Sequence, residues 1–125
     1  MTPDPVRVLI VDDHDVFAGA LEALLDRCAD ISVVGVAHDG AEAVELADSA
    51  EADVVLMDLS MPVLDGFEAA RRLRERRAAL TVIALTGHAQ EEVADRLREH
   101  GMTYLSKDLV HEHVIDAIRA AVQQH

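Results

Sequence analysis

Short runs of apolar residues, several of them rich in valine and isoleucine, recur along the chain between longer segments with a different pattern. The first run shows no alternation of apolar and polar residues, which is typical of a strand covered on both faces of a sheet. The later runs are similarly short, so each predicts a further strand. The predicted strands are residues 6–12, 31–37, 53–58, 80–86 and 103–106.

Between these runs, apolar residues recur every three or four positions, as they do on one face of an amphipathic helix. The predicted helices end near residues 27, 49, 77, 100 and 124. Asp39 and Asp65 each stand three positions before a Glu, which is the spacing of an N-terminal helix cap. Gly101 has the position of a C-terminal cap. The side chains expected to face the core are Phe17, Leu21, Leu24, Leu25, Phe67, Ala70, Leu73, Val114, Ile115, Ile118 and Val122.

Five strands alternating with five helices predict a parallel sheet with right-handed crossovers and helices on both faces. This is a doubly wound, three-layer α/β architecture. The length of 125 residues is typical of one domain, so residues 1–125 are expected to form a single unit. In such sheets, ligands bind beyond the carboxyl ends of the strands.

The formal net charge of −13 comes from 24 acidic and 11 basic residues. This excess repels phosphate backbones and anionic lipid surfaces, so we expect this segment to contact neither nucleic acid nor membrane. No apolar run reaches the roughly 18 residues of a membrane span, and no secretory signal is visible at the N-terminus. Cys28 is the only cysteine, which agrees with a cytoplasmic location.

Polar residues stand at the carboxyl ends of four predicted strands. They are Asp12 and Asp13, Asp58, Thr86, and Lys107, which is the only lysine of the chain. Three carboxylates in one site repel one another unless a cation intervenes, and oxygen ligands of this kind suit Mg²⁺. A carboxylate beside such an ion can act as a nucleophile and form an aspartyl phosphate, while an ammonium and a hydroxyl group stabilise the phosphoryl oxygens. The set therefore predicts phosphoryl transfer to an aspartate.

The segments that carry these residues resemble the receiver domain of bacterial two-component response regulators, along essentially the whole chain. The matching segments are VLIVDDH (8–14), VLMDLSMP (55–62) with DG (65–66), ALTG (84–87) and YLSKD (104–108). The Asp-Asp-His opening and the Lys-Asp pair are most similar to the NarL/FixJ (LuxR-type) subgroup, whose members usually regulate transcription. The resemblance implies a flavodoxin-like sheet with strand order 2-1-3-4-5.

By this resemblance, Asp58 receives a phosphoryl group from a phosphohistidine of a sensor histidine kinase or a phosphotransfer protein. Mg²⁺, or Mn²⁺ in its place, is held by Asp12, Asp13 and Asp58 together with the backbone carbonyl of Ser60. The domain is then a phosphoacceptor in signalling rather than an enzyme acting on a separate substrate.

The resemblance also implies a switch. Lys107 pairs with the bound phosphoryl group, Thr86 moves to hydrogen-bond it, and Tyr104 swings inward behind Thr86. The signal emerges on the face made by the fourth helix, the fifth strand and the fifth helix. Ser60 and His88 flank the site and are expected to tune the lifetime of the acyl phosphate by controlling the approach of water.

Two enzymatic or cofactor-binding classes compete with this interpretation. A phosphatase resembling the haloacid dehalogenases has its nucleophile on the first strand, with a second acid two residues later, whereas Asp58 lies on the third predicted strand. A flavodoxin-like flavin carrier needs aromatic rings and a hydroxyl-rich phosphate loop, and Asp12 and Asp13 would repel that phosphate. A receiver that works without phosphorylation is a third alternative, which the complete acceptor set argues against.

The sequence does not decide how the domain passes on its signal. The chain is expected to be either the receiver of a transcription regulator whose DNA-binding domain lies outside it, or a stand-alone regulator acting through protein contacts. Homodimerisation through the first and last helices, or through the fourth helix, is a further hypothesis. His14 is interpreted as a loop residue, and His111 and His113 as a solvated pair.

Overall fold

The computed structural model describes residues 4–59, 66–76, 79–86, 99 and 102–123. Within these residues it forms one sheet of five parallel strands in the order β2-β1-β3-β4-β5, so the predicted topology is confirmed. The strands are β1 (Val6–Val11), β2 (Ile31–Ala37), β3 (Val54–Asp58), β4 (Thr81–Thr86) and β5 (Thr103–Ser106).

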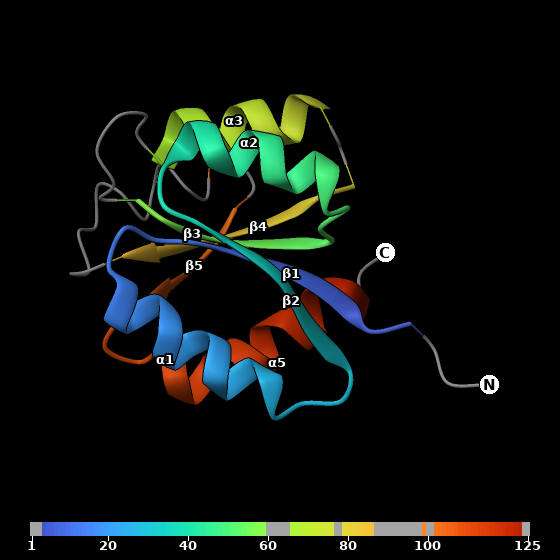
Figure 1. Ribbon diagram of the computed structural model, residues 1–125, viewed down its shortest axis with the longest axis vertical. Helices are drawn as coiled ribbons and strands as arrows, with labels where there is room; N and C mark the ends of the chain where they lie inside the picture. The colour runs from blue at the N-terminus through green and yellow to red at the C-terminus, as the bar shows by residue number, and fades with distance from the viewer. Residues whose placement is uncertain (1–3, 60–65, 77–78, 87–98, 100–101, 124–125) are drawn as a thin grey trace.

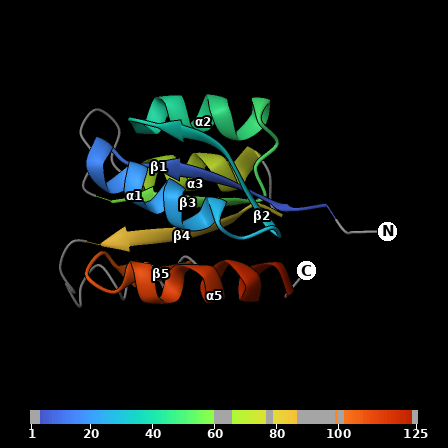
Figure 2. The same ribbon diagram turned by 60° about the horizontal axis from the view of Figure 1, so that its bottom comes forward.

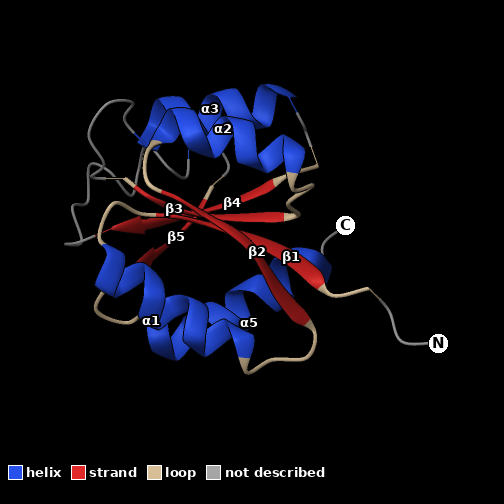
Figure 3. Cartoon of the chain, viewed as in Figure 1, coloured by secondary structure: helices blue, strands red, loops and turns tan. Residues whose placement is uncertain are grey.

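Helices cover both faces of the sheet, and Figures 1 and 3 show the three layers from the same side. One face carries α1 (Asp15–Asp26) and α5 (Val110–Gln123), and the other carries α2 (Gly40–Ser49) and α3 (Gly66–Arg76). The turned view shows α5 running beside β5 at the sheet edge (Figure 2). Of the predicted helix at 90–100 the structure describes only Glu99, which is helical. The expected caps Gly101 and Asp65 lie outside the described residues.

The sheet separates two apolar cores, because successive residues of a strand point to opposite faces. The α2/α3 core consists of Leu9, Val11, Ala37, Ala43, Ala47, Ala52, Val55, Met57, Ala69, Ala70, Leu73, Leu80, Val82, Ala84 and Met102. The α1/α5 core consists of Val8, Ile10, Ala18, Leu21, Leu25, Ile31, Val54, Leu56, Ile83, Leu85, Val110, Val114 and Ile118. Strands buried on both faces in this way explain why the first run has no alternation of apolar and polar residues.

The predicted helix faces are largely confirmed among the side chains that the structure describes, which do not include that of Phe67. Phe17, Leu24 and Ile115 are half-buried and pack against the α1/α5 core, beside buried residues of the same helices. The expectation for Val122 was wrong, since 38% of this residue is exposed. At 1.5 Å per residue, α5 is about 21 Å long, whereas the four residues of β5 span only about 13 Å. The last turn of α5 therefore extends beyond the strand on which it packs.

The predicted cap of α2 is also confirmed. The Asp39 side chain accepts a hydrogen bond of 2.8 Å from the backbone N–H of Glu42. The Glu42 carboxylate in turn accepts one of 3.3 Å from the backbone N–H of His38. Both acids satisfy N–H groups around the first turn of α2, and their negative charge favours the positive end of the helix dipole. This fixes where the chain turns after β2.

Candidate functional site

Asp12 and Asp58 lie side by side at the carboxyl ends of the two central strands. Asp12 follows β1 and donates its backbone N–H to Ala37 O at 3.0 Å, while Asp58 is the last residue of β3. The parallel pairing of Val11 with Met57 brings these two carboxylates opposite each other, and both residues are fully buried. Each continues the alternation toward the α1/α5 face of its strand.

Lys107 brings its ammonium group to both carboxylates. Its backbone N–H donates to Thr86 O at 2.7 Å, which fixes the chain directly after β5. Its Nζ donates a hydrogen bond of 3.1 Å to Asp58 Oδ2 and lies 3.0 Å from Asp12 Oδ2, with 17% of the side chain exposed. The predicted convergence of these three residues is confirmed.

Two opposing effects act on the pKa of Lys107. Burial is the larger single effect and lowers it, because a charged ammonium loses solvation. The contacts with Asp12 and Asp58 raise it, and together they exceed the effect of burial, so the pKa of Lys107 is raised above its ordinary value. Lys107 is therefore a firmly protonated cation at neutral pH.

His14 joins the carboxylates, although the sequence predicted no more than a loop residue there. Its Nδ1 lies 3.0 Å from Asp12 Oδ1, 3.1 Å from Asp13 Oδ1 and 3.9 Å from Asp58 Oδ2. Its backbone N–H donates to Asp12 Oδ1 at 2.8 Å. The potential ligand atoms of Asp12, Asp13, His14 and Asp58 all lie within 4.8 Å of one another. The sequence feature that could have indicated this role is the position of His14 directly after Asp12 and Asp13.

Phe17 is a second neighbour of the site that the sequence assigned only to the core. The Lys107 ammonium lies over the face of its ring, 4.6 Å from the centroid. At this distance the negative face of the aromatic ring attracts a cation. The same ring stacks on His111, with centroids 6.0 Å apart and planes at 18°. Phe17 thus connects α1, Lys107 and the first turn of α5.

Thr86 and Tyr104 lie at the same end of the sheet but belong to its other face. Thr86 is only 8% exposed, and its hydroxyl has no hydrogen-bond partner among the described residues. Tyr104 is half-buried against the α2/α3 core, to which its strand partner Ala84 also belongs. The predicted flanking residues Ser60 and His88 lie outside the described part of the chain.

The donor set of the site fits a hard divalent cation. Asp12, Asp13 and Asp58 supply three carboxylates, against one ammonium within the described residues. Asp12 Oδ2 is fully buried and faces the Lys107 ammonium at 3.0 Å. Mg²⁺ and Mn²⁺ bind such oxygen ligands and would offset the excess of negative charge.

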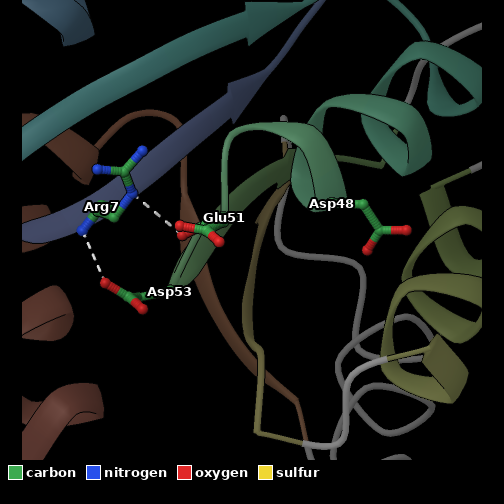
Figure 4. A pocket seen from close by; sticks show the side chains of 4 residues that line it. All are labelled: Arg7, Asp48, Glu51 and Asp53. Atoms are coloured by element: carbon green, nitrogen blue, oxygen red, sulfur yellow. Dashed lines mark hydrogen bonds between the residues drawn. The ribbon is translucent and has the colours of Figure 1, made fainter.

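A shallow pocket at the opposite ends of the strands has a structural explanation. It is lined by Arg7, Asp48, Glu51 and Asp53 (Figure 4). The Arg7 guanidinium donates to the carbonyl oxygens of Ala50 at 2.7 and 3.0 Å and of Glu51 at 3.2 Å, and so caps the C-terminus of α2. Asp48 forms an ion pair with an arginine of α3. The Asp53 carboxylate accepts a hydrogen bond of 3.0 Å from the backbone N–H of Arg7. These contacts give Arg7, Asp48 and Asp53 structural roles.

Comparison with known proteins identifies the family. The model of the response regulator receiver domain matches residues 8–119. The chain belongs to this family. The receiver is 33% identical over 120 residues to the nitrate/nitrite response regulator protein NarL of Escherichia coli, and 38% identical over 117 residues to the transcriptional regulatory protein LiaR of Bacillus subtilis. These alignments cover 94% and 93% of this chain but only 55% and 56% of the relatives, so the chain spans about half their length.

Solved structures agree with this membership. The receiver superimposes with a TM-score of 0.90 on a two-component response regulator of the LuxR family from Aurantimonas sp., at 29% identity, covering 98% of this chain and 88% of that one. It superimposes with a TM-score of 0.85 on the response regulator domain of Thermotoga maritima CheB, at 30% identity, covering 95% and 97%. The likeness to the NarL/FixJ subgroup is thus confirmed. No helix within the described residues is long and apolar enough to span a membrane.

Proposed function

We propose that the receiver accepts a phosphoryl group on the carboxylate of Asp58. The observation that carries this proposal is the fully buried Asp58 carboxylate, held by the Lys107 ammonium beside Asp12 at the end of β3. A carboxylate oxygen of Asp58 attacks the phosphorus of a phosphohistidine, the P–N bond breaks, and its electron pair stays on the imidazole nitrogen. The products are an acyl phosphate on Asp58 and a free histidine on the donor.

The proposed cofactor is Mg²⁺ or Mn²⁺, held by Asp12, Asp13 and Asp58 and by the backbone carbonyl of Ser60. When bound, such an ion neutralises charge on the phosphoryl oxygens. Lys107 stays within reach of Asp58 and donates to a second phosphoryl oxygen. Its firm protonation supports this role. The excess of carboxylates over ammonium groups supports the need for the ion.

Thr86 and Tyr104 are proposed to report the phosphoryl group to the surface. The Thr86 hydroxyl, which has no hydrogen-bond partner among the described residues, gains a hydrogen bond when it moves to a phosphoryl oxygen, and this gain favours the active arrangement. Tyr104 then moves inward toward the space that Thr86 leaves. The changed surface is the face formed by the fourth helix, β5 and α5, while Ser60 and His88 control the access of water to the acyl phosphate.

The biological setting is part of the proposal. A sensor histidine kinase or a phosphotransfer protein supplies the phosphoryl group in the cytoplasm, and the receiver, a single domain over residues 1–125, acts without nucleic acid or membrane contact of its own. Membership of the NarL/FixJ subgroup favours control of transcription through a DNA-binding domain outside this chain. Homodimerisation on phosphorylation is the proposed link between the phosphoryl group on Asp58 and the control of transcription.

Intact mass spectrometry after incubation with acetyl phosphate tests the acceptor chemistry. Wild-type protein is expected to gain one phosphoryl group with Mg²⁺ and none with a chelator, and Asp58→Asn is expected to gain none. A matched control is Asp53→Asn, since Asp53 lies at the other end of β3. No adduct on folded wild-type protein, together with no beryllofluoride binding, would favour a receiver that works without phosphorylation.

A further inference from the structure

His14 occupies a position among the carboxylates that a metal ligand would occupy. The inference drawn from it rests on the proposed function, because it concerns the ion that serves Asp58. The imidazole Nδ1 lies almost equally far from Asp12 Oδ1 and Asp13 Oδ1, at 3.0 and 3.1 Å, and 3.9 Å from Asp58 Oδ2. One nitrogen thus faces oxygens from three carboxylates at once.

These spacings agree with the edges of a coordination octahedron. Ions of this size bind their ligands at about 2.0–2.1 Å, so two adjacent ligands of an octahedron lie about 3.0 Å apart. The distances from Nδ1 to Asp12 Oδ1 and to Asp13 Oδ1 have this value. The distance to Asp58 Oδ2 is longer than an edge and closes with a small movement of an imidazole that is 63% exposed.

The backbone around His14 restrains where the imidazole can go. His14 is the N-cap residue of α1, and its N–H is bonded to Asp12 Oδ1. The backbone N–H of His14 therefore holds the Asp12 carboxylate, and the imidazole Nδ1 of the same residue lies beside that carboxylate. Asp12 Oδ2 is buried and lies 3.0 Å from the Lys107 ammonium, so Oδ1 is the Asp12 oxygen that faces the His14 imidazole.

We propose that His14 is a protein ligand to the ion at this site and sets its metal preference. A nitrogen donor adds little affinity for Mg²⁺, which prefers oxygen, and much more for Mn²⁺, Co²⁺ and Ni²⁺, which accept imidazole readily and bind more tightly in that order. His14 takes a coordination position that water fills in a site made only of oxygen ligands. The receiver is then matched to transition ions more closely than its carboxylates alone predict.

Titration calorimetry with Mg²⁺ and with Ni²⁺ tests this on the unphosphorylated protein. We expect His14→Phe to lose at least tenfold in Ni²⁺ affinity and to change less than about threefold for Mg²⁺. His113→Phe is the matched control, because His113 is exposed on α5 and is not among the clustered ligand residues. If circular dichroism shows that His14→Phe is unfolded, His14→Ala, which offers no ligand atom, replaces it with the same expectation.

A spectroscopic measurement identifies the ligand directly. Electron spin echo modulation of bound Mn²⁺ should show a directly coordinated ¹⁴N in wild type and in His113→Phe, and none in the His14 variant. Unchanged Ni²⁺ affinity, an equal loss for both ions, or a gain for Mg²⁺ on removing the imidazole would overturn the inference. In those cases the oxygen site still binds Mg²⁺, whereas failure of the proposed function appears as absence of Mg²⁺ binding and of a phosphoryl adduct in wild type.

Discussion

Lys107 is the one cation that the described residues place between Asp12 and Asp58, and both of these carboxylates are fully buried. Removing one partner of a buried ion pair leaves an uncompensated charge, which costs far more than an exposed pair contributes. The stability of the metal-free protein therefore depends on this side chain, even though it is also part of the proposed phosphoryl site. A divalent ion at the same carboxylates would take over part of that role.

Replacing this cation with an apolar side chain of similar length tests the dependence. We expect Lys107→Met to lower the free energy of unfolding by about 3 kcal/mol without metal. The loss should be clearly smaller at a Mg²⁺ concentration about ten times the Kd. Urea titrations of both forms provide the measurement. Arg27→Met, on an exposed position after α1, is the control and should change stability by less than about 0.5 kcal/mol. Equal losses with and without Mg²⁺ would contradict the argument.

The ring of Phe17 should stabilise Lys107 through its face as well as through its size. Phe17→Leu keeps an apolar side chain but removes the π-face 4.6 Å from the ammonium, so we expect a loss of about 1–2 kcal/mol in the free energy of unfolding. Phe17→Tyr retains the face and should stay within about 0.5 kcal/mol of wild type. A Leu variant as stable as the Tyr variant would mean that only volume matters here.

The residues of the site differ in how far the sequence could predict them. Asp12, Asp58, Thr86 and Lys107 were predictable because each stands at the end of a strand, and all parallel strands end on the same edge of the sheet. The sequence could not place the His14 imidazole beside Asp12 and Asp13, or the Phe17 ring beside Lys107. Their contacts depend on how α1 lies against the strand ends and on side-chain rotamers, which have no counterpart in hydrophobic periodicity.

At the scale of elements, contacts between residues that are close in the sequence were predictable, and contacts between distant residues were not. The cap of α2 was predicted from Asp39 and Glu42, because the residues that satisfy a helix N-terminus are neighbours in sequence. The cap at the other end of α2 comes from Arg7, which lies 43 residues before Ala50 in the sequence. No local sequence pattern predicts this contact. It supports a left-handed turn at Glu51, whose φ of 52° is unusual for a residue other than glycine.

A second distant contact joins α5 to the loop before β2. The Arg119 guanidinium donates to both oxygens of Asp30, from Nε at 2.9 Å and from Nη2 at 3.0 Å. These hydrogen bonds, opposed by a weaker effect of burial, lower the pKa of Asp30 below its ordinary value. A carboxyl group whose pKa is lowered on folding adds stability above its ordinary pKa, and this contribution is lost as the pH falls through the lowered value.

We therefore expect the pKa of Asp30 to rise in Arg119→Gln, as measured by NMR titration of the carboxyl carbon. The unfolding free energies of wild type, Asp30→Asn, Arg119→Gln and the double variant should show a favourable coupling at pH 7. That coupling should fade as the pH drops below about 4, where the carboxyl becomes protonated. Glu22→Gln is a control at a half-buried acid that is not among the groups shifting the pKa of Arg119. Coupling that persists at low pH would point to packing instead of charge.

The whole molecule carries 24 acidic and 11 basic residues, and this imbalance affects its stability as a unit. Like charges over the surface repel one another and oppose the compact state, and salt screens them over a distance that falls from about 10 Å at 0.1 M to about 3 Å at 1 M. Exposed ion pairs such as those of Arg71 with Glu68 and Glu75 weaken in salt as well. Each such pair contributes little, so the net repulsion should dominate.

Thermal unfolding at rising salt concentration measures this balance. We expect the Tm to rise by a few degrees between about 0.05 and 1 M KCl, as the self-repulsion is screened. MgCl₂ at matched ionic strength should raise it further in wild type, through the carboxylate site, and less in Asp12→Asn. A Tm that falls with KCl would show that the ion pairs outweigh the net charge.

The sheet divides the receiver into two separately filled compartments, since the two apolar cores share no residue within the described part of the chain. Asp12 and Asp58 belong by their strand alternation to one compartment, and Thr86 and Tyr104 to the other. The proposed acceptor chemistry and the proposed readout are therefore exposed to different sets of core substitutions. If these roles hold, a lineage could change the packing around Tyr104, and with it the partner of the domain, while the packing beneath the Asp58 carboxylate is inherited unchanged.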